Sequence, residues 1–174
     1  MLNQNPNFEK TCCFTGPRPK NFPWGNEDKK YIVPLMNQIE AEIRKAIDIG
    51  YYHFITGMAI GVDTYACRIV LKIKKEQPHL RLEAAIPFPS QPLKWTESQK
   101  AEYAELLEMV DKKIIIGQEP TTENFNKRNE YMVDNSKLLI AVNSNKNGGT
   151  QRTLQYAKSL KRDIVVIEPM EFYR

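Results

Sequence analysis

Residues 55–67 read ITGMAIGVDTYAC: an apolar run, two glycines four positions apart, and the start of a helical pattern. Glycines between a strand and a helix let a ligand approach bare backbone, and the helix start that follows offers unpaired N–H groups to an anion. The spacing matches neither G-x-G-x-x-G nor the P-loop. Asp63, at the expected N-cap, would compete with a phosphate or instead accept a ribose hydroxyl or a base N–H. The stretch predicts a ligand-binding loop; the alternative is that the glycines only close a tight turn.

The same alternation of apolar runs and helical patterns extends along the chain. We expect strands at 11–15, 52–56, 81–87, 112–116, 137–142 and 163–169, and helices at 27–49, 64–76, 97–110, 123–135 and 150–160. Apolar strands separated by helices are typical of a parallel sheet covered on both faces. The sequence therefore predicts an α/β fold: a single Rossmann-like doubly wound domain over 1–174, mostly parallel, with strand order 3-2-1-4-5-6 favoured. Residues 1–9 are expected to be a flexible N-terminal tail.

Composition narrows the function classes. Of the 174 residues, 41% are hydrophobic and 26% are charged, and the net charge is +4. No apolar run is long enough to cross a bilayer and the first residues lack a signal-peptide pattern, so we expect a cytoplasmic protein with no membrane partner. Three cysteines without a C-x-x-C pair, and two histidines, predict no metal site. The charge permits anionic ligands but does not by itself indicate nucleic acid.

The unusual residues of the chain follow the expected strand ends. In open α/β sheets, ligands bind outside the carboxyl ends of the strands, where the strand order reverses. Five loops meet this condition, and they read TGPRP, TGMAIGVD, IPFPSQPLKW, GQEPTTENFNKRN and NSNKNGGTQRT. We expect them to form one cleft, with these candidate ligand-binding residues: Thr15, Gly16, Arg18, Gly57, Met58, Gly61, Asp63, Gln91, Trp95, Arg128, Asn129, Gly148, Gly149 and Thr150.

Some of these residues have specific expected roles. Gly148 to Thr150 form a second glycine-rich helix start suited to a phosphate. Arg18, between two prolines, could clamp a phosphate or carboxylate with its planar fork, and Trp95 could stack on a base. The alternatives are structural: a surface arginine in a loop, and an indole that only packs that loop.

The motifs CCFTGPRP, HFITGMAIGVDTYA, LEAAIPFPSQPLKW, KRNEYMVDNSKLLIAV and GGTQRT, in this order, resemble the YpsA-like family of the SLOG superfamily. The resemblance covers nearly the whole chain. It implies a Rossmann-like fold and a nucleotide or nucleotide-derived ligand of the NAD, ADP-ribose or nucleoside monophosphate type, with no required cofactor. A homodimer is expected by analogy only.

Two other branches of the superfamily offer alternatives. The loop TGMAIGVDTYA looks like that of DprA/Smf proteins, which bind single-stranded DNA. The segment KRNEYMVDNSKLLIAV with GGT looks like that of LOG-type phosphoribohydrolases, for which Arg128 and Glu130 would be the catalytic candidates. Their pattern ends in a glutamate, but here Gln151, Arg152 and Thr153 follow the GGT segment, and Pro17 replaces the family's usual histidine.

N-glycosidic cleavage needs a carboxylate to stabilise an oxocarbenium-like centre and activate water. Asp63 or Glu130 could substitute for the missing one. We therefore favour a binding module, a sensor or carrier, over a nucleotide-processing enzyme. Single-stranded DNA binding is possible but not favoured, because the chain lacks a stripe of alternating basic and aromatic residues.

Overall fold

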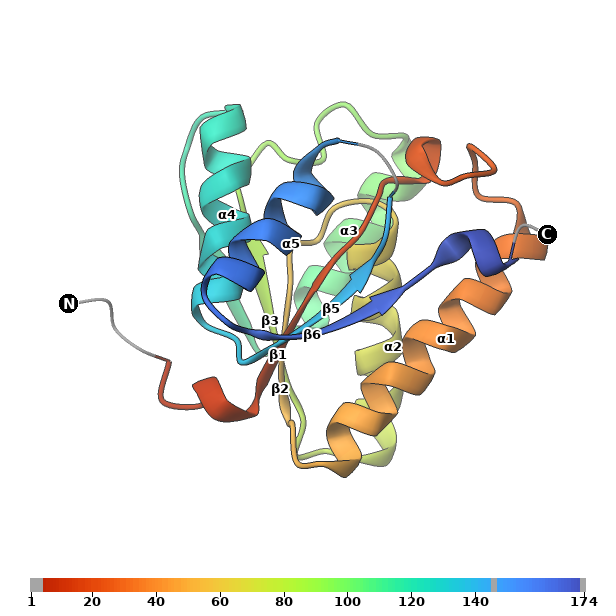
Figure 1. Cartoon of the computed structure of the whole chain (residues 1–174). Helices are drawn as coiled ribbons and strands as arrows, with labels where there is room; N and C mark the ends of the chain where they lie inside the picture. Colours follow the sequence, from red (N-terminus) through yellow and green to blue (C-terminus); the bar gives the residue numbers. More distant parts are fainter. Residues whose placement is uncertain (1–4, 145–146, 173–174) are drawn as a thin grey trace.

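The computed structural model describes residues 5–144 and 147–172 (Figure 1). Strands and helices alternate along this part of the chain, as the sequence predicts. The strands are β1 (Thr11–Thr15), β2 (His53–Thr56), β3 (Arg81–Ile86), β4 (Lys112–Ile115), β5 (Leu138–Val142) and β6 (Asp163–Ile167). The α-helices are α1 (Lys29–Asp48), α2 (Val62–Glu76), α3 (Glu97–Met109), α4 (Thr122–Asp134) and α5 (Gly149–Ser159).

All six strands are parallel to their neighbours, so the predicted Rossmann-like α/β class is confirmed. The strand order is β4-β3-β2-β1-β5-β6, and the favoured order was wrong in one respect: β4 lies at the edge beyond β3, not beside β1. The right-handed crossover rule allows the chain to turn back after either strand, so the alternation alone did not decide the order. Lys112, Lys113 and the half-exposed Ile115 are typical of an edge strand.

Two hydrophobic cores lie on the two faces of the sheet. Helices α1, α2 and α3 cover one face, and α4 and α5 cover the other (Figure 1). Successive strand residues point to opposite faces, so Cys12 and Phe14 pack in the first core while Cys13 packs in the second. Helices therefore cover much of both faces, and the loops after the strands meet at the carboxyl end of the sheet.

The helix starts differ in how they are capped. Asp28, Thr96 and Thr121 cap α1, α3 and α4 with their side chains. In contrast, α2 and α5 begin after Gly61 and Gly148, with no side-chain cap. The expectation that Asp63 is an N-cap was therefore wrong: α2 begins one residue before it, because Gly61 takes a φ of 99° that leads the chain directly into the helix.

The segment before β1 packs against the amino-terminal end of the sheet. Asn5 Nδ2 donates to Thr11 Oγ1 and to the carbonyl of Asn135, both at 3.0 Å. The 3-10 helix Phe8–Lys10 follows, with the Arg162 guanidinium 4.6 Å from the centre of the Phe8 ring. Residues 1–4 of the expected tail lie outside the described residues. No helix in the described ranges is long and apolar enough to cross a membrane.

Candidate functional site

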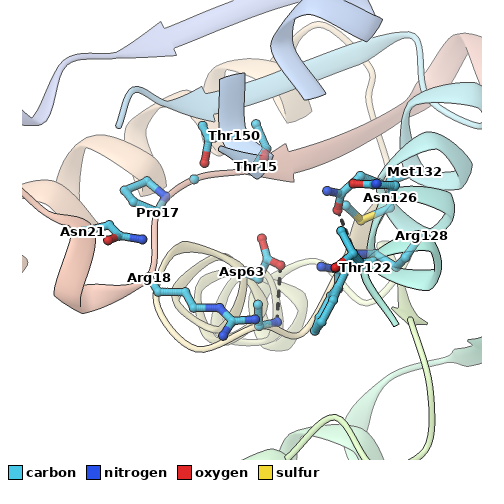
Figure 2. A pocket seen from close by; sticks show the side chains of 15 residues that line it. Thr15, Pro17, Arg18, Asn21, Asp63, Thr122, Asn126, Arg128, Met132 and Thr150 are labelled. Atoms are coloured by element: carbon cyan, nitrogen blue, oxygen red, sulfur yellow. Dashed lines mark hydrogen bonds between the residues drawn. The ribbon is translucent and has the colours of Figure 1, made fainter. Parts of the chain in front are cut away.

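A hollow of about 280 Å³ opens at the carboxyl end of β1, where the strand order reverses between β1 and β5 (Figure 2). The loop after β1, Ala59 of the loop after β2, the first turns of α2 and α5, and residues along α4 surround it. We call it the first hollow. It is lined by Thr15, Gly16, Pro17, Arg18, Asn21, Ala59, Asp63, Thr122, Phe125, Asn126, Arg128, Asn129, Met132, Gly149 and Thr150.

Arg128 is the buried cation of the first hollow, with 5% of its surface exposed. Its Nε donates to Asn129 Oδ1 at 2.8 Å, and its Nη1 donates to the main-chain carbonyl of Gly57. Burial lowers the pKa of Arg128 and the nearby Asp63 raises it. Since a guanidinium keeps its proton in proteins, the site holds a positive charge that the surrounding side chains do not fully pair.

Asp63 is a buried carboxylate in the first turn of α2 (Figure 2). Its Oδ2 accepts from the Ala59 N–H at 3.3 Å. Burial raises the pKa of Asp63 above its ordinary value of 3.8, although Arg128, the Ala59 N–H and Arg18 each act to lower it. A carboxylate with one internal donor has lone pairs left to accept hydrogen bonds from hydroxyl or amine groups of a ligand.

Two guanidinium groups lie close to one aromatic ring. The Cζ atoms of Arg18 and Arg128 lie 5.5 Å and 5.9 Å from the centre of the Phe125 ring. Gly149 and Thr150, at the uncapped start of α5, form another part of the wall. A helix start and two arginines around one small volume make a site of positive potential, suited to a phosphate or another anion.

The structure brings together eight of the fourteen residues that the sequence suggested. Four others support the walls or lie outside. Met58 is buried with a φ of 57°, and a Cβ on Gly61 would lie 2.7 Å from the Pro17 carbonyl oxygen. Gly57 contributes its carbonyl to Arg128, while Gly148 precedes α5 without lining the hollow. The eight that line it are Thr15, Gly16, Arg18, Asp63, Arg128, Asn129, Gly149 and Thr150.

Gln91 and Trp95 line a neighbouring hollow of about 620 Å³, which we call the second hollow. Gln91 is engaged in the protein interior: its Nε2 donates to the Gly57 carbonyl at 3.2 Å, and its Oε1 accepts from the Tyr103 hydroxyl at 3.2 Å. The Trp95 ring packs edge-on against Tyr103, with 5.2 Å between the ring centres. Gln91 therefore positions the backbone of the loop after β2.

The two catalytic candidates lie in different places. Arg128 faces the first hollow, whereas Glu130 lines hollows between α4, α5 and the sheet edge with Lys127 and Tyr156. Thr153, where the LOG pattern has its carboxylate, donates from Oγ1 to the Gly149 carbonyl at 2.8 Å. Of the carboxylates considered, Asp63 is the one in the first hollow. In the described part of the chain, no three His, Cys, Asp or Glu residues gather into a possible metal site.

Sequence reasoning missed part of the α4 wall. Thr122, Phe125 and Asn126 precede Asn129 by seven, four and three positions, so they lie on one helix face. That spacing was visible in the sequence and could have identified them. Asn21, in the loop after β1, had no such signal.

The chain is similar to known proteins over most of its length. The YpsA family model, described as the YspA SLOG family, matches residues 12–172. The SPbeta prophage-derived protein YoqJ of Bacillus subtilis is 38% identical over 119 residues, covering 62% of this chain and 70% of that protein. The UPF0398 protein YpsA of Bacillus subtilis is 23% identical over 152 residues, covering 86% of this chain and 84% of that protein.

Two solved structures share the fold. DNA processing protein A (DprA) from Streptococcus pneumoniae gives a TM-score of 0.58 at 16% identity, over 92% of this chain and 50% of that chain. DprA from Helicobacter pylori, whose structure addresses its single-stranded DNA binding mode, gives 0.59 at 14% identity, over 92% and 66%. The present chain thus spans between half and about two thirds of these DprA chains.

Proposed function

The chain belongs to the YpsA family of SLOG proteins, and on this premise we propose that it is a binding module for a small phosphate-bearing, nucleotide-like ligand. The observation that carries the proposal is the convergence of Arg18, Arg128 and the uncapped start of α5 on the first hollow. These groups come from three segments far apart in the sequence. Their positive charge, partly removed from water, favours an anion over a neutral ligand.

Different lining residues suit two different parts of such a ligand, its phosphate and its ribose or base. We place its phosphate between Thr150 at the start of α5 and the guanidinium of Arg18. A ribose hydroxyl or base N–H would then donate to Asp63, and Asn129 would add an amide. Such a mixture of one anion-binding wall and a few convergent polar groups is typical of small-molecule sites.

We propose binding without turnover, as a sensor or carrier. A hydrolase of the LOG type needs a carboxylate at the start of α5, and Thr153 is found there. Glu130 faces away from the first hollow.

The proposal extends to a cytoplasmic location, because Cys12, Cys13 and Cys67 are free and buried. It also extends to a homodimer, which light scattering would test.

The test is calorimetric titration with ribose 5-phosphate, AMP and ADP-ribose, followed by analysis for released base. We expect saturable binding of at least one of these ligands and no free adenine. Arg18→Gln should weaken the binding at least tenfold, and Lys29→Gln, which removes the same charge from the exposed start of α1, should not. Absence of binding by all three ligands would overturn the proposal, and release of adenine would replace it with the hydrolase.

Single-stranded DNA is the second candidate ligand, and it is favoured by the fold shared with DprA. Backbone phosphates could follow the two arginines, with a base against Phe125. An oligothymidine titration at low and high salt tests this candidate, since each phosphate contact makes the affinity fall steeply with salt. Salt-dependent binding that exceeds the affinity for AMP would favour DNA.

A further inference from the structure

The second hollow adjoins the first at two residues. Arg18 and Phe125 line both hollows, and the second hollow extends from them toward the loop after β3 and the start of α3. Its 620 Å³ is more than twice the 280 Å³ of the first hollow. Pockets that enclose small ligands usually measure about 300–1,000 Å³, so the first hollow alone is small for a whole nucleotide.

The two hollows differ in chemistry. The first is lined mainly by charged and amide groups, whereas the second combines charged side chains (Lys20, Glu27 and Lys94) with an apolar wall of Phe88, Leu93 and Trp95. Leu93 is 68% exposed, so its apolar side chain is open to contact with a ligand. The Phe125 ring, edge-on to Phe88 at 4.9 Å between ring centres, joins this wall to the arginines.

We infer that the second hollow binds the aromatic ring end of the same ligand, so that its phosphate end lies in the first hollow and its chain passes Arg18. This inference rests on the proposed function and adds a ligand class to it. A bare sugar phosphate would fill only the first hollow. A nucleotide would also bury its base against Leu93 and Trp95, which adds apolar and stacking contacts. The second hollow then determines selectivity for base-bearing ligands.

The experiment compares ribose 5-phosphate with AMP and ADP-ribose, which add an adenine to a phosphate-bearing ribose. In the unmodified protein we expect at least tenfold tighter binding of an adenine-bearing ligand than of ribose 5-phosphate. Ser90→Tyr places a bulky side chain in the second hollow, away from the first. It should reduce the gain to less than threefold and leave the affinity for ribose 5-phosphate unchanged. Ser98→Tyr, at an exposed position on α3 outside both hollows, is the matched control and should keep the full gain.

A second variant covers the case in which Ser90→Tyr disturbs the fold. Leu93→Ser removes apolar contact at an exposed position and should reduce the adenine gain at least threefold. The inference is overturned if the adenine gain is absent, if it survives both variants, or if an oligonucleotide competes for the second hollow more strongly than ADP-ribose does. If no ligand binds at all, including ribose 5-phosphate, the proposed function itself fails, so the two failures are distinguishable.

Discussion

Arg128 donates a hydrogen bond from Nη1 to the main-chain carbonyl of Gly57, a residue 71 positions earlier in the chain. Gln91 Nε2 donates to the same oxygen at 3.2 Å. One buried carbonyl therefore joins the loop after β2, the loop after β3 and α4. Because this internal bond holds the guanidinium, its position is set by the fold before any ligand arrives.

Gly57→Ala should disrupt this junction. A Cβ at this position would lie 2.5 Å from Arg128 Nη1 and 2.7 Å from Asp63 Oδ2, so both side chains would have to move. We expect a loss of about 1–3 kcal/mol in the free energy of unfolding, measured by urea denaturation, together with weaker ligand binding. Gly148→Ala is the control, since its Cβ would meet nothing within 4 Å. Equal stability losses in the two variants would contradict the prediction.

Arg128→Lys should weaken ligand binding, and the lysine should not keep the hydrogen bonds that the arginine makes. The arginine uses two separate nitrogens, Nε for Asn129 and Nη1 for Gly57, whereas a lysine carries all its donors on one atom and should not keep both bonds. We expect at least tenfold weaker binding of AMP in calorimetry. Unfolding should cost about 1–3 kcal/mol less because a buried carbonyl loses a donor. Arg152→Lys, exposed on α5, should change neither quantity. Unaltered AMP affinity in Arg128→Lys would remove Arg128 from the site.

Asp63→Asn should stabilise the unliganded protein near neutral pH. Burial raises the pKa of Asp63, so between its ordinary value of 3.8 and the raised value the folded state binds more protons than the unfolded state. The contribution of Asp63 to stability therefore falls as the pH rises through that window. In urea denaturation at pH 7, Asp63→Asn should have a higher free energy of unfolding than the unmodified protein. This difference should shrink toward pH 4. Asp48→Asn, at an exposed position, should show no such trend. A difference that grows on acidification would refute the assignment.

Glu83→Gln should have the opposite pH behaviour. Burial raises the pKa of Glu83, but hydrogen bonds from His53, Tyr131 and Lys112 outweigh burial and lower it below 4.5. Its stabilising contribution is thus complete above pH 4.5 and is lost as the pH falls through the lower, folded value.

We expect Glu83→Gln to cost about 1–3 kcal/mol in urea denaturation at pH 7, and less at acid pH. The control is Glu108→Gln, which breaks an exposed pair with Lys113 at 3.1 Å and should cost less than about 1 kcal/mol. Similar costs for the two variants would show that the buried cluster adds no stability.

Local signals were sufficient for the fold class. Apolar strands such as β5, each followed or preceded by a helical pattern, required a parallel sheet, and the carboxyl ends of parallel strands share one edge. The loops after β1, β2 and β5 are therefore expected to lie together at this edge. Lys112 and Lys113 favour an edge position for β4, but charged residues alone do not specify the strand order.

Which side of the molecule a helical side chain faces is decided by the tertiary structure. Glu130 follows Arg128 by two residues, which rotates its side chain about 200° around α4, since a helix has 3.6 residues per turn. Which of the two faces the first hollow depends on how α4 packs, and Met132 and Val133 in the second core decide this. The assignment of Gln91 also depended on packing, because an amide that suits a ligand equally suits the buried Gly57 carbonyl.

The sequence by itself determined the α/β architecture, the edge at which the candidate site lies and the residue types available there. These follow from periodicity and turn chemistry, which act over a few residues. The tertiary structure decided the strand order, the separation of Glu130 from Arg128 and the division of the site into two hollows at Arg18 and Phe125. Those features depend on contacts between residues far apart in the chain, such as Arg128 and Gly57, which no local pattern specifies.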